Sequence, residues 1–139
     1  MSIEIVLPMW SALRDRFQDK IKTIPEEELH KSLGDTSIGD LLYHTAEVEY
    51  MFAAWFFDWP KETDIIRPET MQGHVQLLHA SNEHFIQGMK NLSEENWQLV
   101  RSSALGDSTP VEAVGRLMNH AGIHSGQISY IQTYGSVEE

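Results

Sequence analysis

The spacing of apolar residues constrains this chain most, because it follows the period of an α-helix over long stretches. We predict four helices, over residues 5–24, 37–59, 69–91 and 109–134. No segment shows the apolar–polar alternation that is typical of a β-strand. Helices of this length predict an all-α fold, a four-helix bundle that forms a single domain over residues 1–139. The connection over residues 60–68 is long enough for a crossover along the bundle.

Three helix ends carry sequence signals. Thr109 and Glu112 stand three residues apart at the start of the fourth segment, which is the pattern of a capping box. Ser37 and Asp40 approximate the same motif at the start of the second segment. Gly135 follows the last helical turn and predicts the end of the fourth helix.

Each predicted helix has an apolar stripe that we expect to face the core. In the first helix the stripe consists of Met9, Leu13, Phe17 and Ile21. In the fourth helix the spacing alternates between four and three residues, and the stripe consists of Ala113, Leu117, His120, His124, Gln127, Ile131 and Tyr134. The fourth stripe therefore places two histidines where core residues are expected.

Composition narrows the classes of function. Hydrophobic residues make up 41% of the chain, which favours a folded core over disorder. The chain has no cysteine, which excludes a disulfide, a thiolate metal site and a cysteine nucleophile. The formal net charge of -11 disfavours binding to nucleic acids and to anionic membranes. Neither a signal peptide nor a membrane-spanning segment is predicted, and we expect a cytoplasmic protein.

Three histidines predict a metal site. His120 and His124 are four residues apart and therefore lie on one face of the fourth helix. His44 lies in the apolar stripe of the second helix, in register between Leu41 and Val48. Three neutral imidazoles with an open position are the ligand set of a catalytic metal site. The alternative is that these histidines are structural and that a polar network satisfies them.

The other histidines do not form a second site. His74, His79 and His84 are spaced by five residues, which turns each about 140° from the last. We expect each to be solvated, with the alternative that one of them lines the mouth of the site. His30 lies in a connecting segment and is expected to be exposed. A di-metal carboxylate site would need a Glu-x-x-His motif in each of two core helices. The only such motif ends at His30, outside the main helices, so a mononuclear site is favoured.

Two further residues are candidates for the chemistry. Glu47 would act as a partner of a metal ligand or as a general base, or it is a surface residue. Gln127 would hydrogen-bond a ligand or orient an imidazole, or it is an amide that packs between helices. Other groups with possible roles are the acid–base candidates Tyr43 and Tyr130, and the pocket-wall or core candidates Trp10, Trp55 and Trp59.

Two stretches resemble a known family. The run Asn119-His120-Ala121-Gly122-Ile123-His124-Ser125-Gly126-Gln127-Ile128 resembles the C-terminal helix signature of the DinB-like, or YfiT-like, superfamily. The run from Ser37 to His44 is similar to its second-helix signature, and the ending Tyr130-Ile131-Gln132-Thr133-Tyr134-Gly135 also fits. The resemblance spans essentially the whole chain.

This resemblance implies a four-helix bundle with a long crossover, which frequently forms a homodimer. It implies one divalent metal ion, zinc or nickel, on His44, His120 and His124. Relatives include thiol S-transferases that act with small thiols such as bacillithiol or mycothiol, a thiol-dependent isomerase and hydrolases. The family name implies no DNA binding. Many members have arginine after the last ligand, where this chain has Ser125, so an anion-holding role does not carry over to that position.

The leading hypothesis is a metal-dependent enzyme of the thiol S-transferase or hydrolase type that acts on a small molecule, with a low-molecular-weight thiol as a candidate cosubstrate. The metal would activate a thiol or water. The alternative is a non-catalytic metal-binding protein with a structural or vestigial site. A third hypothesis is a dimeric stress protein that acts through partner contact, for which exposed aromatic residues around Trp55, Phe56 and Phe57 would be evidence.

Overall fold

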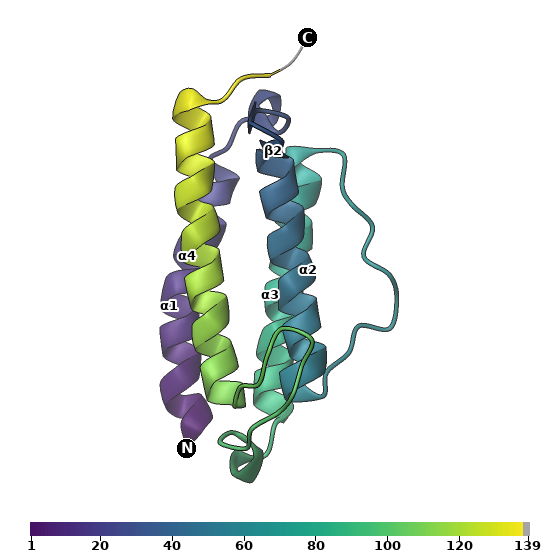
Figure 1. Cartoon of the computed structure of the whole chain (residues 1–139), viewed down its shortest axis with the longest axis vertical. Coiled ribbons are helices and arrows are strands. Elements are labelled where there is room, and N and C mark those ends of the chain that lie inside the picture. Colours follow the sequence, from purple (N-terminus) through teal and green to yellow (C-terminus); the bar gives the residue numbers. More distant parts are fainter. Residues whose placement is uncertain (138–139) are drawn as a thin grey trace.

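The computed structural model describes residues 1–137 as a bundle of long helices (Figure 1). The helices are α1 (Ser2–Lys22), α2 (Ile38–Phe57), α3 (Met71–Asn91) and α4 (Pro110–Tyr134). The shorter elements are the 3-10 helices η1 (Glu26–Glu28) and η2 (Glu94–Asn96) and the strands β1 (Ser32–Leu33) and β2 (Thr36–Ser37). The predicted four-helix bundle is confirmed, and no described helix is long and apolar enough to cross a membrane.

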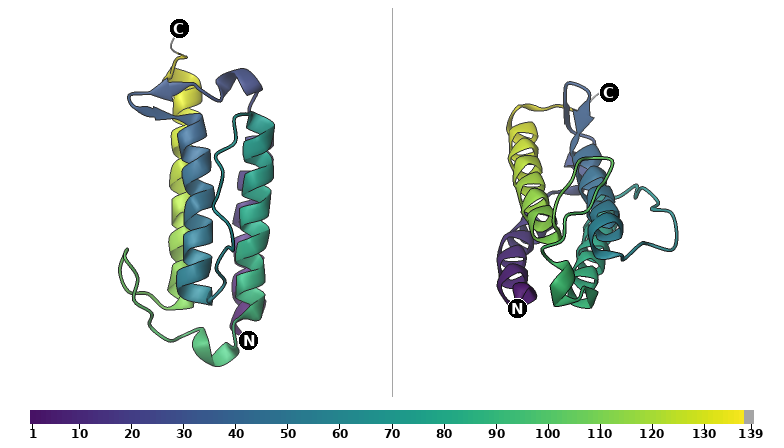
Figure 2. Two further views of the ribbon diagram at one scale, coloured as in Figure 1. Left: turned by 90° about the vertical axis from the view of Figure 1, so that its right-hand side faces the viewer. Right: turned by 60° about the horizontal axis from the view of Figure 1, so that its bottom comes forward.

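The order of the helices requires a crossover. Helices α1 and α4 run in one direction and α2 and α3 in the other, so α2 and α3 are parallel neighbours (Figures 1 and 2). Residues 58–70 connect them and run back along the full length of the bundle. Helix α2 lies beside α4, and the two face each other along one seam of the bundle (Figure 2). This seam carries the candidate site.

The helix starts follow the capping signals. Thr109 and Ser37 each accept a hydrogen bond from the backbone three residues later, and the capping boxes with Glu112 and Asp40 are complete. Helix α3 begins two residues later than predicted because Thr70 caps it, with its hydroxyl accepting from the Gly73 amide at 2.9 Å.

Helix α1 begins at Ser2, three residues before the predicted start. The carboxylate of Glu94, at the same end of the bundle, accepts hydrogen bonds from the Ser2 amide at 2.9 and 3.0 Å. It thereby satisfies a backbone donor that the first turn of a helix leaves free. Such a partner 92 residues away in the sequence leaves no local signal.

The prediction that the chain has no strand was wrong for a short hairpin. Strands β1 and β2 pair antiparallel around Gly34, whose φ of +65° suits a residue without a side chain. Each strand has two residues, too few for an alternating pattern. Gly135 follows the last residue of α4 as predicted, and a Cβ atom at this position would lie 2.7 Å from the Ser32 carbonyl oxygen. The hairpin and the end of α4 therefore pack directly on each other.

Two predicted stripes drift out of the core. Met9 was expected inside but is 54% exposed, while its neighbour Trp10 is buried. Residues spaced strictly by four turn by about 40° at each step, so a row that starts at Ile21 leaves the core by Met9. In α4, Tyr134 is exposed for a related reason: a 3.5-residue repeat drifts by about 20° per heptad on a straight helix. Gln127 is also exposed, because the buried face of α4 passes through its neighbour Ile128.

The core has an aliphatic half near the hairpin and an aromatic half at the opposite end. The buried aromatic residues include Trp10, Phe56, Phe57 and Phe85. Phe56 and Phe57 are fully buried and Trp55 is half-buried, so this run belongs to the core and not to an exposed aromatic surface. The described residues therefore do not show the exposed aromatic surface that would support a function through partner contact.

A buried polar network lies between the two halves of the core. The Arg14 guanidinium of α1 donates to both carboxylate oxygens of Glu49 of α2, at 2.6 and 3.1 Å. It also donates to the carbonyl oxygen of Leu78 and the amide oxygen of Gln18. The Ser81 hydroxyl donates to Glu49 at 2.6 Å. Every member has partners, as a buried charge pair requires.

Candidate metal centre

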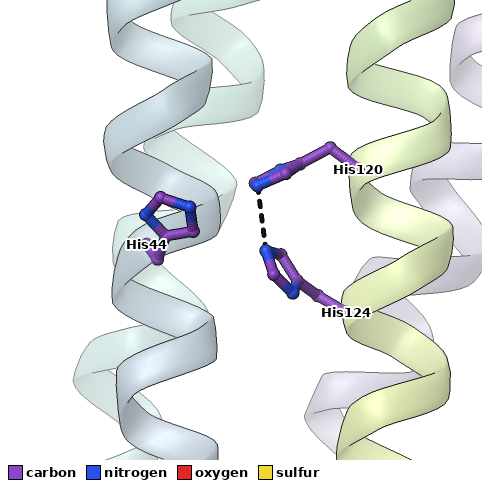
Figure 3. A group of neighbouring side chains, drawn as sticks. All are labelled: His44, His120 and His124. Atoms are coloured by element: carbon purple, nitrogen blue, oxygen red, sulfur yellow. Dashed lines mark hydrogen bonds between the residues drawn. The ribbon is translucent and has the colours of Figure 1, made fainter. Parts of the chain in front are cut away.

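The three predicted histidines meet across the seam between α2 and α4. His44 projects from α2, and His120 and His124 project from successive turns of α4 (Figure 3). One ligand nitrogen from each ring lies within 4.8 Å of the other two. Residues 76 positions apart in the sequence are therefore brought together by the packing of two helices.

The site opens from the interior of the bundle to solvent. His124 is buried, His120 is half-buried and His44 is exposed. The expectation that His44 points into the core was thus wrong: it is exposed and lies at the mouth of the site. The ring of His44 stands edge-on to both partners, with centroids 5.1 Å from His120 and 5.4 Å from His124.

The environment keeps the two α4 imidazoles neutral. Burial, together with charge repulsion from the neighbouring His124 and His44, lowers the pKa of His120 to about 4. Burial also lowers the pKa of His124, against the effect of the hydrogen bond that its ring donates to Gln127, which raises it. Near pH 7 both rings therefore retain a nitrogen lone pair, which is the form that binds a metal ion.

Gln127 determines which nitrogen of His124 is free. Its amide oxygen lies 2.6 Å from His124 Nδ1. An amide oxygen can only accept, so Nδ1 carries the proton and Nε2 carries the lone pair. His124 Nε2 in turn accepts a hydrogen bond from His120 Nε2 at 2.9 Å (Figure 3). The two nitrogens therefore point toward one position, and a metal ion bound there would replace the proton between them.

The donor set fits a divalent metal ion. Three imidazole nitrogens converge, and within residues 1–137 no carboxylate joins the group as a fourth ligand. Zinc and nickel both accept imidazole ligands, and three histidines with an open position are typical of catalytic zinc sites. Glu47 lies on α2, three residues after His44, and is outside the group, so its role stays a prediction. A catalytic role for Gln127 also stays a prediction.

The remaining histidines lie elsewhere. His30 and His79 are exposed, as predicted. His84 is half-buried, with Nε2 2.7 Å from the Trp59 carbonyl oxygen, and it anchors the start of the crossover. His74 was expected in solvent but is 1% exposed, and its Nδ1 has no hydrogen-bond partner. The end of the crossover around Pro68 covers it, a contact between segments that helical spacing does not predict.

Two recesses flank the histidines along the seam. The first, of about 500 Å³, has His44 and His120 at one side. Its other lining residues are mostly apolar and are Val48, Met51, Phe52, Leu105, Arg116, Leu117, Asn119 and Ile123. The second, of about 400 Å³, is lined by Gln127 and by Leu33, Thr36, Leu41, Gly126, Tyr130 and Ile131. A third cavity, between α1 and α4, does not reach the histidines.

The structure places two further candidates, Tyr130 and Tyr43, and adds one residue that was not predicted. Tyr130 lines the second recess and remains available to it, being 56% exposed. The Tyr43 hydroxyl instead donates to the Ile65 carbonyl oxygen of the crossover at 3.0 Å. Arg116 was not among the predicted site residues. Its signal was present in the sequence, because Arg116, His120 and His124 are spaced by four and share one face of α4.

Comparisons with known proteins agree with this architecture. A family model described as the DinB superfamily matches residues 9–128. A crystal structure described as that of a DinB-like protein from Bacillus cereus superimposes with a TM-score of 0.76, covering 99% of this chain and 96% of that one. The two sequences are 17% identical, so this likeness concerns the fold alone. No curated protein matches the chain.

Proposed function

This chain belongs to the DinB superfamily, and on that premise we propose that it is a divalent-metal-dependent enzyme of the thiol S-transferase or hydrolase type. The observation that carries the proposal is the convergence of His44, His120 and His124 at the open seam. Bound there, a zinc or nickel ion would lower the pKa of a thiol or of water and supply a nucleophile at neutral pH.

The protein's own residues prepare the site for this chemistry. Burial holds His120 and His124 in the neutral form, and Gln127 fixes the ring of His124 with Nε2 free. The exposed position of His44 leaves one side of the site open to small molecules. The apolar wall formed by Val48, Leu117 and their neighbours would shield a bound substrate from water.

The two recesses favour group transfer over hydrolysis. An S-transferase must hold a thiol and an acceptor on either side of the reacting atom, whereas a hydrolase needs room for one substrate and water. The recess of about 500 Å³ is lined by His44 and His120, and the recess of about 400 Å³ is lined by Gln127, the hydrogen-bond partner of His124. A low-molecular-weight thiol in one and its acceptor in the other is the arrangement that we propose.

The first test is the metal content of untagged protein, measured by mass spectrometry beside His124→Ala. We expect near-stoichiometric zinc or nickel in the wild type and almost none in the variant. His79→Ala is the matched control, because His79 is an exposed histidine away from the site. A wild-type protein that stays free of metal after incubation with either ion would overturn the proposal.

The alternative is a structural or vestigial metal site, and cobalt substitution separates it from an enzyme. A thiol that reaches the open position of a cobalt-loaded site changes the visible absorption spectrum, whereas a closed structural site does not respond. We expect the spectrum to change on addition of a small thiol. No response to any thiol tested, together with unfolding of His120→Ala, would favour the structural role.

The proposed function also includes an oligomeric state, a cellular location and the classes of partner. We propose a homodimer in the cytoplasm that binds neither nucleic acid nor membrane, in keeping with the charge of -11. Sedimentation equilibrium tests the oligomeric state, with a mass of twice the chain's 15.9 kDa expected. A mass equal to one chain at every concentration would contradict the dimer and leave the metal site unaffected.

A further inference from the structure

We propose that the larger recess binds small organic anions, and that Arg116 is the residue that selects them. The ligand would combine an apolar body with a carboxylate, sulfonate or phosphate group. The inference rests on the proposed function, since it names the class of substrate that would lie beside the histidines. It starts from one observation: Arg116 is the only charged residue that lines the recess within the described chain, apart from the histidines themselves.

Arg116 is held firmly, but only by neutral partners. One guanidinium nitrogen donates to the Ser108 hydroxyl at 2.9 Å, and another donates to the Leu105 carbonyl oxygen at 2.7 Å. The guanidinium also stacks over the ring of Phe52, with Cζ 5.1 Å from the ring centroid. Five N–H donors are available on the side chain, so donors remain for a ligand.

The guanidinium of Arg116 forms no salt bridge in the described part of the protein. Arg14, Arg67 and Arg101 each form an ion pair with a carboxylate, and Arg116 forms none. The nearest acidic residue along α4, Glu112, uses its carboxylate to accept from the Thr109 amide in the capping box. Glu112 lies one turn before Arg116 and attracts it electrostatically, but no carboxylate forms a salt bridge with the guanidinium in the described residues, which leaves it able to pair with a ligand anion.

The apolar walls define the rest of the ligand. Val48, Phe52 and Leu117 are buried, and Met51 is half-buried, so together they offer a hydrophobic surface beside the guanidinium. A half-buried guanidinium in such surroundings is stabilised by an anion that binds through two parallel hydrogen bonds. The recess therefore complements a molecule that is apolar at one end and anionic at the other.

The position of Arg116 on α4 places the proposed anion site next to the histidines. Arg116 precedes His120 by four residues, so the two side chains leave the same face of α4 one turn apart. A ligand held by Arg116 would therefore present atoms about 5–6 Å further along the helix to His120 and His44. This spacing suits a compact substrate and would place its reactive part at the metal centre.

Two fluorescent probes test the proposal. 1-Anilinonaphthalene-8-sulfonate has an apolar body and an anionic group, and N-phenyl-1-naphthylamine has the same ring system without the sulfonate. We expect the sulfonate probe to bind the zinc-loaded protein at least about tenfold more tightly, and Arg116→Gln to abolish that preference. The neutral probe should bind wild type and variant alike. Equal affinity of the two probes for the wild type would overturn the proposal.

Matched variants make the result specific. Arg16→Gln removes an exposed arginine of α1 that lines the cavity away from the histidines, and it should leave both affinities unchanged. Ile123→Glu adds a negative charge at an exposed position of the recess and should weaken the sulfonate probe alone. If Arg116→Gln fails to fold, the Ile123→Glu variant still tests whether the recess binds the sulfonate probe. Undiminished binding of the sulfonate probe to a folded Arg116→Gln or Ile123→Glu protein would sink the assignment.

Metal content keeps this test separate from the proposed function. Arg116→Gln should retain the zinc of the wild type, because Arg116 is not a ligand. His124→Ala should lose zinc and still prefer the sulfonate probe. Loss of that preference in His124→Ala but not in Arg116→Gln would show that the probe binds to the metal and not to Arg116, which would overturn this inference and leave the metal site standing.

Discussion

The side chains of the candidate metal centre differ in burial and in hydrogen bonding, and these differences give each a distinct role. His124 is buried and oriented by Gln127, His120 is half-buried and faces it at 2.9 Å, and His44 is exposed at the mouth. The two α4 imidazoles hold the fixed positions, while His44 can adjust at the surface. Arg116, one turn away, supplies charge without taking part in the ligand set.

Loss of the Gln127 contact should weaken metal binding. In Gln127→Leu the ring of His124 is no longer fixed with Nε2 free, and outer partners of this kind typically contribute about 10–100-fold in metal affinity. We expect at least about a tenfold loss in zinc affinity, measured by competition with a chelating dye. Gln132→Leu on the same helix is the control. An unchanged affinity in Gln127→Leu would show that the contact is incidental.

Buried His74 should make the metal-free protein sensitive to acid. Burial lowers its folded-state pKa below the ordinary value of 6.5. The unfolded chain therefore takes up the proton first, so stability present above pH 6.5 is lost as the pH falls below it. We expect His74→Gln to reduce the drop in unfolding free energy between about pH 7.5 and 5.5, measured with urea in the presence of a chelator.

The comparison for His74 is His79→Gln, at an exposed position of the same helix. This control should show the same loss of stability on acidification as the wild type. If His74→Gln and His79→Gln give equal slopes, the acid sensitivity has another source.

Helices were the part of the fold that could be predicted most fully from the sequence. The capping boxes at Ser37 and Thr109 are local, so the starts of α2 and α4 were predicted within one residue. It was harder to predict which side chains of each helix face the core, because a stripe spaced by four or by 3.5 residues turns steadily around a straight helix. Met9 and Tyr134, at the far ends of two such stripes, are therefore exposed.

A metal ion in this site would act as a clamp between two helices, since its ligands come from α2 and α4. Zinc should therefore raise the melting temperature, and an ion present at 100 times its dissociation constant adds about 2.7 kcal/mol to the unfolding free energy. We expect the rise in wild type and His79→Ala but not in His124→Ala, by differential scanning fluorimetry. A rise of equal size in all three proteins would locate the ion elsewhere.

At the scale of the whole molecule, the polar network at the middle of the core joins α1, α2 and α3. Arg14 and Glu49 are both buried and fully hydrogen-bonded, and Ser81 completes the network. The sequence patterns did not predict this network. The residues around Arg14 are the same whether its side chain binds water or a carboxylate 35 positions away in the sequence. The same limit hid His74 beneath the crossover.

Breaking this network should destabilise the bundle strongly. Arg14→Met or Glu49→Leu leaves one buried charge without its partner, which typically costs about 3–5 kcal/mol. The double variant should lose less than the sum of the two, because it leaves no unpaired charge. Urea unfolding measures each value. Additive losses in the double variant would show that the two charges do not depend on each other.

The exposed ion pair between Arg101 and Asp58 is the control for this cycle. Asp58 is largely in solvent, so Asp58→Asn should lower the unfolding free energy by less than about 1 kcal/mol. A loss as large as that of Glu49→Leu would mean that burial does not explain the difference between the two pairs.

The recess beside the histidines has a further consequence for how such a protein can diverge. Leu105 and Ile123 are exposed and Met51 is half-buried, whereas the Arg14–Glu49 network lies inside the bundle. Substitutions at these three positions alter the shape offered to a substrate at little cost in stability. A lineage built on this bundle can therefore exchange one substrate for another in single mutational steps, while the scaffold and its three histidines are inherited unchanged.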